Sequence, residues 1–365
     1  MRIIHCADLH LESPLKNLLD ESKAKDRRDE ILDNFSRLVD YAVNNDVSVI
    51  IFAGDTFDRK STRKTPIRRI FEQISEHESI NFVFLKGNHD KRGVFEGEYE
   101  IPDNVTLIQG PEWTKYESGN VVIKGVELTE DNYKDIAHSL VLDPGKCNIV
   151  TLHCGAANHK GDKKVYEINF NDLKNKHIDY LALGHIHKYI REQLDDRGVF
   201  VYPGCLEGRG FDEAGIKGFV LLDIDEEGKI IDTFVPFANR IIYRLEVEVT
   251  PNDSMRDIID KISDVTLDIK NKDLVEIILV GKTNMDDLVD IDVRRIKREF
   301  SDHFYFFRVK DHTTVEVDYA SFANDRSLKG EFVRLLERQS DVSDEDKSII
   351  VELGIKALRG ENLDI

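Results

Sequence analysis

Residues 81–90 read NFVFLKGNHD, in which an apolar run passes directly into a glycine and polar side chains. Two earlier runs, Arg2–Ala7 and Val47–Ala53, have the same apolar character and also end at polar residues. Continuous apolar runs of this length are typical of strands that are buried on both faces of a sheet. Asp26 to about Asn45 and Thr65–His77 show the apolar spacing of amphipathic helices. The alternation of strand and helix predicts an α/β architecture with helices packed on the sheet.

After about residue 104 the apolar runs become more frequent, which predicts a second sheet facing the first. The expected strands are Val105–Ile108, Asn120–Leu128, Asn148–His153, Tyr180–Gly184, Val199–Tyr202, Gly218–Asp223 and Lys229–Val235. We therefore expect a fold of the α/β (α+β) class over residues 1–240, a two-sheet sandwich flanked by helices. Residues 241–320 predict a small α+β accessory domain, and residues 321–365 predict a C-terminal helical segment.

The composition is that of a globular, acidic chain. The 365 residues contain 51 Lys and Arg against 70 Asp and Glu, a net charge of −19. This balance argues against a protein that coats nucleic acid by bulk charge alone.

No apolar run approaches the roughly 20 residues of a membrane span, and no signal peptide is visible, so a cytoplasmic location without membrane contact is expected. The four cysteines form no CxxC pair, which favours reduced, packed thiols.

Side chains of metal-binding type follow the apolar runs, each at the point where an expected strand ends. They are Asp8 and His10, Asp55, Asn88 with His89 and Asp90, His153, and His185 with His187. Ligands gather at the carboxyl ends of strands in open α/β sheets, so we expect these side chains to converge. A lone histidine is usually an ordinary surface or core residue, but this repeated placement is much less expected by chance. The sequence therefore predicts a metal centre.

The residue types at these positions suit a pair of divalent cations. Asp and His are hard-to-borderline ligands that fit Mn, Fe, Zn or Ni. Residues two apart in extended backbone point the same way, so Asp8 and His10 can hold one ion, whereas His185 and His187 can reach two neighbouring ions. Asp55 is the candidate for a carboxylate that bridges both. Two such cations can clamp the attacking and leaving oxygens of an in-line phosphoryl displacement.

The order D-x-H, G-D, G-N-H-[DE], H and G-H-x-H over residues 8–187 resembles the pattern of the calcineurin-like metallophosphoesterases. Residues 4–11 (IHCADLHL) and 54–58 (GDTFD) are similar to its DNA repair exonuclease branch, which contains SbcD and YhaO-type nucleases. The continuation HLESPL at 10–15 is closest to the YhaO-type subgroup. The resemblance covers about residues 1–235 and implies the calcineurin-like phosphoesterase fold with a capping-like accessory domain.

The resemblance also implies roles for the predicted site residues. One metal would be held by Asp8, His10, Asp55 and His187, and the other by Asp55, Asn88, His153 and His185. His89 matches the family's catalytic acid, and Asp90 would orient it. The family commonly works with two Mn²⁺, although the ligand types alone fit Fe, Zn or Ni as well.

The implied activity is that of a two-metal-dependent DNA exonuclease and endonuclease in DNA end processing and repair. The resemblance further implies a homodimer and a partner, an SbcC- or YhaN-like P-loop ATPase. The sequence contains no Walker motif, so ATP dependence would have to come from such a partner. The expected helices within residues 327–358 are candidate docking elements for it.

A basic run at residues 59–69 stands out from the acidic bulk of the chain. Its first basic residues, Arg59, Lys60, Arg63 and Lys64, are candidate contacts for a DNA backbone, and a solvated loop is the plain alternative.

Two other functions stay open. The scaffold also suits a phosphatase or cyclic-nucleotide phosphodiesterase. A non-catalytic scaffold for DNA ends would be expected to have a broken site, whereas every expected ligand is present here.

Overall fold

The computed structural model describes residues 1–13, 15, 21–58, 64–90, 100–156, 166–284, 291–316, 322 and 324–358. The chain divides into two units, Met1–Ile241 and Ile242–Ile365. The second unit contains both the expected accessory domain and the expected C-terminal helical segment, whose separation near residue 320 stays a prediction.

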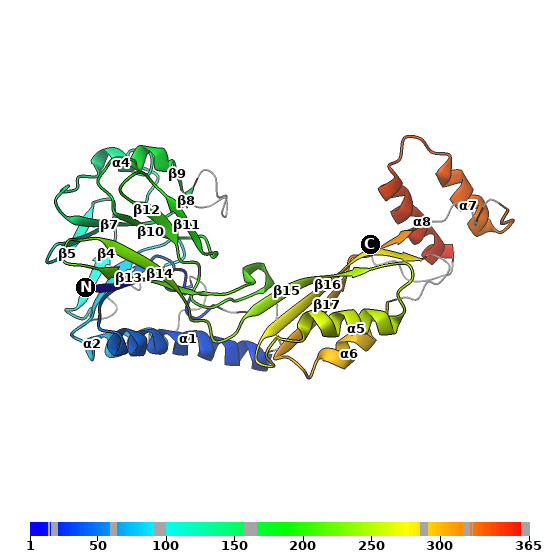
Figure 1. Cartoon of the computed structure of the whole chain (residues 1–365), viewed down its shortest axis with the longest axis horizontal. Helices are drawn as coiled ribbons and strands as arrows, with labels where there is room; N and C mark the ends of the chain where they lie inside the picture. Colours follow the sequence, from blue (N-terminus) through cyan, green and yellow to red (C-terminus); the bar gives the residue numbers. More distant parts are fainter. Residues whose placement is uncertain are drawn as a thin grey trace. The chain divides into compact units, whose positions relative to one another are not determined.

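The first unit contains a six-stranded sheet built around the apolar runs that open the chain (Figure 1). Its order is β14-β13-β1-β2-β3-β4, and β1 to β4 are parallel neighbours. The strands are β1 (Arg2–Cys6), β2 (Val47–Ala53), β3 (Asn81–Leu85), β4 (Val105–Ile108), β13 (Gly218–Ile224) and β14 (Ile230–Pro236). Parallel pairing places the carboxyl ends of β1, β2 and β3 at the same edge of the sheet.

The second sheet has the order β11-β12-β10-β7-β6-β5. Its strands are β5 (Thr114–Ser118), β6 (Val121–Gly125), β7 (Cys147–His153), β10 (Tyr180–Gly184), β11 (Ile190–Gln193) and β12 (Val199–Tyr202). β7 and β10 are parallel, so His153 and Gly184 lie opposite each other at their carboxyl ends. A two-stranded ribbon, β8 (Gly155–Ala156) with β9 (Glu167–Ile168), follows β7.

The prediction that all strands after residue 104 belong to the second sheet is wrong for β4, β13 and β14. β4 pairs with β3, and β13 pairs antiparallel with β1, with Ile4 opposite Leu221. The apolar spacing of a segment predicts that it forms a strand, but the choice of partner depends on hydrogen bonds to distant segments. The strand β5, with its half-buried alternation, is absent from the predicted strands.

Apolar side chains fill the space between the two sheets, and further apolar side chains cover the outer face of each sheet. Ile51 and Leu85 of the first sheet share a buried cluster with Ile149 and Ala182 of the second. Helices α1 (Glu21–Asn44) and α2 (Lys64–Ser75) pack on the outside of the first sheet, and α4 (Ile136–Ser139) packs on the second. Figure 1 shows these helices on opposite sides of the unit. The expected two-sheet sandwich flanked by helices is confirmed.

The second unit has an α+β arrangement. Its parallel sheet has the order β15-β16-β17, with β18 also paired to β16. The elements are β15 (Ile242–Val249), α5 (Met255–Thr266), β16 (Leu274–Asn284), α6 (Val293–Phe300), β17 (Phe306–Asp311), β18 (Thr314–Glu316), α7 (Leu328–Glu337) and α8 (Asp344–Leu358). Ser254 and Asp257 form a capping box at the start of α5. None of the helices within the described ranges has the length and apolar character that a membrane crossing requires.

A buried ion-pair network joins α1 to the loop between β12 and β13. Arg27 Nη2 donates to Glu207 Oε1 at 2.8 Å, and Asn34 Nδ2 donates to Glu207 Oε2 at 2.7 Å. The main-chain N–H of Asn239 also donates to Glu207 Oε2, at 2.6 Å. The side chains of Arg27 and Glu207 are each only 2 % exposed. This network fixes a loop that carries residues of the site described below.

Removing the charge of Glu207 is expected to destabilise the first unit. Glu207→Gln removes one of the two carboxylates paired with the buried Arg27 guanidinium, and Glu30 remains as the other. Breaking a buried ion pair completely typically costs about 3–5 kcal/mol of unfolding free energy, which is the upper limit expected here. Glu72→Gln is the control, because the Arg68–Glu72 pair is largely exposed and should contribute little. Urea unfolding followed by circular dichroism measures both, and equal effects would contradict the role of the network.

Candidate metal centre

The predicted ligands converge where the carboxyl ends of strands from both sheets meet. The loops after β1 and β2 are joined by main-chain bonds, Asp8 N–H to Gly54 O at 3.1 Å and His10 N–H to Asp55 O at 3.0 Å. The second sheet joins them through the N–H of His185, which donates to Asp8 Oδ2 at 3.0 Å. The convergence of these strand ends is therefore a property of the folded chain.

Asp8, His10 and His187 form one group of potential ligands, whose donor atoms all lie within 4.8 Å of one another. The Nε2 atoms of His10 and His187 are 3.3 Å apart, and His187 Nε2 is 3.7 Å from Asp8 Oδ1. Asp8 and His10 are almost completely buried. Nitrogen and carboxylate donors at this spacing can surround one divalent cation.

Asp8, Asp55 and His153 form a second group within the same distance limit. His153 Nε2 lies 3.3 Å from Asp55 Oδ2 and 3.1 Å from Asn88 Oδ1. Asp55 Oδ2 also lies 3.9 Å from His10 Nε2 in the first group, so its carboxylate stands between the two groups. The position fits the predicted bridging role of Asp55.

The chemistry of the donor set fits bound cations. His153 Nδ1 donates to the carbonyl oxygen of Ala53 at 2.8 Å, so a neutral His153 ring has a lone pair at Nε2. That lone pair faces Asp55 Oδ2 and Asn88 Oδ1, which are both acceptors when Asn88 is oriented in this way. Acceptors that face one another need a proton or a metal cation between them. Divalent metal ions are the cations for which this ligand set is suited.

The charges of the site shift the pKa values of its members in the directions expected for such crowding. Burial alone would lower the pKa of His153, but the adjacent carboxylate of Asp55 raises it to about 10. Burial would raise the pKa of Asp55, and the facing His153 outweighs it and holds that pKa below its usual range. Burial raises the pKa of Asp8 and lowers that of His10. A cation bound here would replace the proton on His153.

The ligand loops adopt a backbone that most residues avoid. Asp8, His10 and Asp55 have φ values of 53°, 44° and 50°. Non-glycine residues are uncommon at positive φ and persist where surrounding structure enforces it, often at functional sites. At Gly87, a Cβ atom would lie 2.2 Å from Asp55 Oδ1, so only glycine allows the two loops to approach this closely.

His89 lies at the edge of the centre, with its ring centroid 5.0 Å from that of His10. Its main-chain N–H donates to Asp55 Oδ1 at 2.7 Å. Asp90 accepts main-chain bonds from Phe57 and Gly87, each at 2.8 Å. Burial, followed by the nearby charge of Asp55, raises the pKa of Asp90 to about 7. Asp90 therefore holds the loop that carries His89, and its predicted role in orienting His89 stays a prediction.

Sequence reasoning did not assign a role to several residues of this region. Asp58 joins His10 and His89 in a third group of potential ligand atoms within 4.8 Å. Glu213, in the 3₁₀ turn η2 (Phe211–Glu213), accepts a 2.7 Å bond from His187 Nδ1 and is paired with Arg209. Asp58 ends the GDTFD motif, so its position in the motif could have marked it as a candidate site residue. Glu213 and Arg209 are far from every motif, and only the folded chain brings them to the site.

Of the basic residues predicted to contact DNA, Arg59, Lys60 and Arg63 lie outside the described residues, and Lys64 begins α2.

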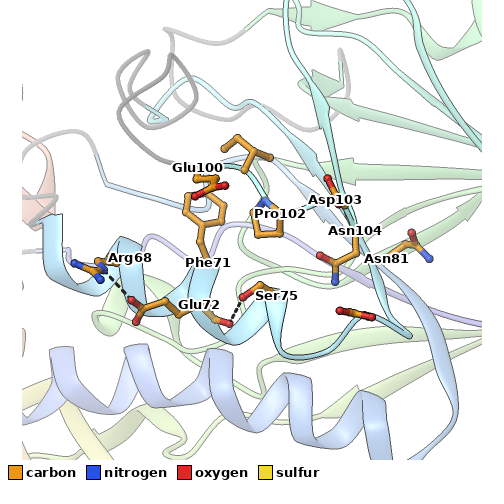
Figure 2. A pocket seen from close by; sticks show the side chains of 11 residues that line it. Arg68, Phe71, Glu72, Ser75, Asn81, Glu100, Pro102, Asp103 and Asn104 are labelled. Atoms are coloured by element: carbon orange, nitrogen blue, oxygen red, sulfur yellow. Dashed lines mark hydrogen bonds and ion pairs between the residues drawn. The ribbon is translucent and has the colours of Figure 1, made fainter.

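A cavity of about 920 Å³ beside α2 is a second concave feature, but its chemistry differs (Figure 2). It is lined by acidic side chains such as Glu72, Glu100 and Asp103, with Arg68 paired to Glu72. None of the predicted ligands lines it. This cavity does not suit a phosphate-bearing substrate, so the metal centre is the better candidate site.

A two-sheet sandwich with converging carboxylates and imidazoles at its strand ends is the architecture of a metal-dependent phosphoesterase. The chain belongs to the calcineurin-like phosphoesterase family, because residues 1–189 match that family. The family is dimetal-dependent, so the expected class of enzyme, a metal-dependent hydrolase of phosphate esters, is confirmed at this level.

Comparison with known proteins also finds relatives that align over most of the chain. It is 26 % identical to the DNA double-strand break repair protein Mre11 of Saccharolobus solfataricus, over 97 % of this chain and 94 % of the relative. Mre11 of Sulfurisphaera tokodaii is likewise 26 % identical, over 96 % and 92 %. The metallophosphoesterase YhaO of Bacillus subtilis is 27 % identical, over 74 % of this chain and 69 % of the relative.

Gly87→Ala is expected to disrupt the centre. The added methyl group would overlap Asp55, so the loop of Asn88 and His89 must shift, and binding of Mn²⁺ should fall at least tenfold in isothermal titration calorimetry. Gly145→Ala is the control, because the one atom that its Cβ would approach within 4 Å is a side-chain oxygen of Asp143, at 3.3 Å, which a small shift of that side chain relieves. Wild-type Mn²⁺ affinity in Gly87→Ala would show that the close approach of the two loops is not needed.

Proposed function

We propose that this protein is a two-metal-dependent DNA nuclease, with exonuclease and endonuclease activity, that acts in DNA end processing and repair. The observation that carries the proposal is the convergence of carboxylate, amide and imidazole acceptors at the strand ends of both sheets, with Asp55 between the two groups. Relatives named as DNA repair proteins align over almost the entire chain, which supports DNA as the substrate.

The proposal divides the candidate ligands between two cations. One cation is assigned to Asp8, His10, Asp55 and His187, and the other to Asp55, Asn88, His153 and His185. Mn²⁺ is the proposed metal for both positions. When bound, the cations would neutralise charge on the phosphate and favour in-line displacement of the leaving oxygen.

The chain's own residues supply positioning and proton transfer in this proposal. His89 donates a proton to the departing sugar oxygen, the role of a general acid. The carboxylate of Asp58, whose atoms come within 4.8 Å of His89 and His10, would orient the His89 ring. Asp90 fixes the loop through the N–H groups of Phe57 and Gly87. The main-chain N–H of His89 donates to Oδ1 of Asp55, which fixes the backbone of the proposed acid beside the proposed bridging carboxylate.

The proposed assembly includes a homodimer and an SbcC- or YhaN-like P-loop ATPase. The C-terminal helices support a docking role, because α7 and α8 expose large apolar side chains. These are Leu328, Leu335, Ile349, Ile350 and Leu358, at 71 %, 52 %, 43 %, 39 % and 47 % exposure. A partner helix or coiled coil is the kind of surface that would cover them. A cytoplasmic location is part of the same proposal.

The first test is a Mn²⁺-dependent assay on end-labelled linear DNA with wild type and His89→Ala. Loss of a general acid typically lowers the rate about 10²–10⁴-fold. A para-nitrophenyl phosphodiester, run in parallel, has a leaving group that hardly needs protonation, so the loss of rate on it should be much smaller. This difference between substrates separates acid catalysis from general damage to the site.

His138→Ala is the matched control, since His138 is exposed and lies outside the centre. Stepwise shortening of DNA that disappears only in His89→Ala supports the proposal. Turnover of nitrophenyl esters without DNA cleavage, with or without the ATPase partner, would instead favour the phosphatase alternative. Wild-type cleavage by His89→Ala would remove His89 from the mechanism.

A second test concerns Arg59, Lys60, Arg63 and Lys64. Changing all of them to Gln should weaken DNA binding and flatten its salt dependence, by about 0.9 in log–log slope for each phosphate that the variant no longer neutralises. The control changes Lys25, Lys174, Lys176 and Lys270 to Gln, which removes the same charge elsewhere. Fluorescence anisotropy across a salt series measures both. Equal slopes in the two variants would exclude this basic run as the part of the chain that binds the DNA backbone.

A further inference from the structure

A carboxylate outside the predicted ligand sets is bonded to one of the proposed metal ligands. Glu213 Oε1 accepts a 2.7 Å bond from Nδ1 of His187, whose Nε2 faces His10 and Asp8. The Glu213 side chain is 6 % exposed. This bond keeps the proton on Nδ1 of a neutral His187 and directs the Nε2 lone pair toward the cation position.

Arg209 holds Glu213 in this position. Its Nη2 donates to Glu213 Oε1 at 2.6 Å, its Nε donates to the same oxygen at 3.1 Å, and its main-chain N–H donates to Oε2 at 2.7 Å. These bonds occupy both carboxylate oxygens, so Glu213 is kept as a partner of His187 instead of turning toward the cations. Lys217 Nζ fixes the main chain of His187, with a 2.6 Å bond to its carbonyl oxygen.

The other group of ligands is oriented differently. His153 directs its Nδ1 proton to the main-chain oxygen of Ala53. A carbonyl of a buried strand carries no net charge and cannot be changed by substitution. Among the described residues, the centre is therefore asymmetric, with one histidine oriented by a charged side chain and the other by neutral backbone.

We propose that Glu213, clamped by Arg209, is a positioning residue that sets the metal affinity of the Asp8–His10–His187 position without affecting the Asn88–His153 position. The inference rests on the proposed two-metal centre and deepens it. A carboxylate bonded to a ligating imidazole raises its basicity and fixes its orientation, and loss of such partners typically costs 10–100-fold in metal affinity. The main-chain carbonyl of Ala53 supplies orientation alone.

The test is titration of the full-length apoprotein with Mn²⁺ by calorimetry, with bound metal counted by elemental analysis. Glu213→Gln keeps the size of the side chain and removes its charge. The expected result is two Mn²⁺ in the wild type and a 10–100-fold weaker affinity at one site in the variant, with the other site unchanged. Asp212→Asn is the matched control, because it removes an exposed charge from the same turn and should bind like wild type.

Wild-type affinity at both sites of Glu213→Gln, or equal weakening of both, would overturn the inference. If Glu213→Gln does not fold, Arg209→Gln decides, since it releases the carboxylate and should weaken the same single site; unchanged binding there counts against the proposal. The readout is independent of the substrate. A wild type that binds two Mn²⁺ but does not cleave DNA would refute the nuclease and leave this inference standing, whereas a wild type that binds fewer than two would refute both.

Discussion

The hydrogen bond from His153 Nδ1 to the carbonyl oxygen of Ala53 joins the two sheets at the point where the ligands meet. His153 ends β7 in one sheet, and Ala53 ends β2 in the other. The bond needs the absence of side chains around it. A Cβ on Gly54 would lie 2.2 Å from His153 Nδ1, and one on Gly184 would lie 1.9 Å from the Ala53 oxygen. The glycines of the motifs are therefore required by the approach of the two sheets, in addition to the turns they permit.

Once the sheets are joined in this way, the electrostatics of the centre follow. Asp8 and Asp55 are both buried, and burial together with the like charge of Asp55 raises the pKa of Asp8. In the free protein, the negative charge of these carboxylates is compensated by histidine. The nearby carboxylates accordingly raise the pKa of His153 to about 10. A bound divalent cation is a larger local charge than any of these groups and reverses that balance. The same carboxylates that crowd each other in the free protein become favourable neighbours when cations are present.

Sequence reasoning predicted that the candidate ligands converge because each follows an apolar strand, and strand ends in parallel sheets share an edge. It could place Asp55 and His153 in one site without knowing which strands pair. It failed for the partners of β4 and β13, because pairing depends on distant segments. The role of Asp90 in orienting His89 stays a prediction from the motif. The structure gives Asp90 main-chain partners and groups Asp58 with His89 among the potential ligand atoms within 4.8 Å of one another. Glu213 had no local signal, since its contact with His187 exists only after the loop between β12 and β13 has folded.

That loop links the stability of the fold to the metal centre. Glu207, bonded to Arg27 of α1, and Glu213, bonded to His187, lie on the same short connection. The ligand residues at positive φ each carry a backbone cost of about 1–3 kcal/mol, so the surrounding contacts must hold them in place. The buried ion pair of Glu207 fixes this loop, and the fixed loop can in turn keep Glu213 and His187 in position. Because cations would bind only the folded arrangement of these candidate ligands, their binding free energy would add to folding stability. Bound cations and the loop would thus stabilise the same backbone geometry of the candidate ligands.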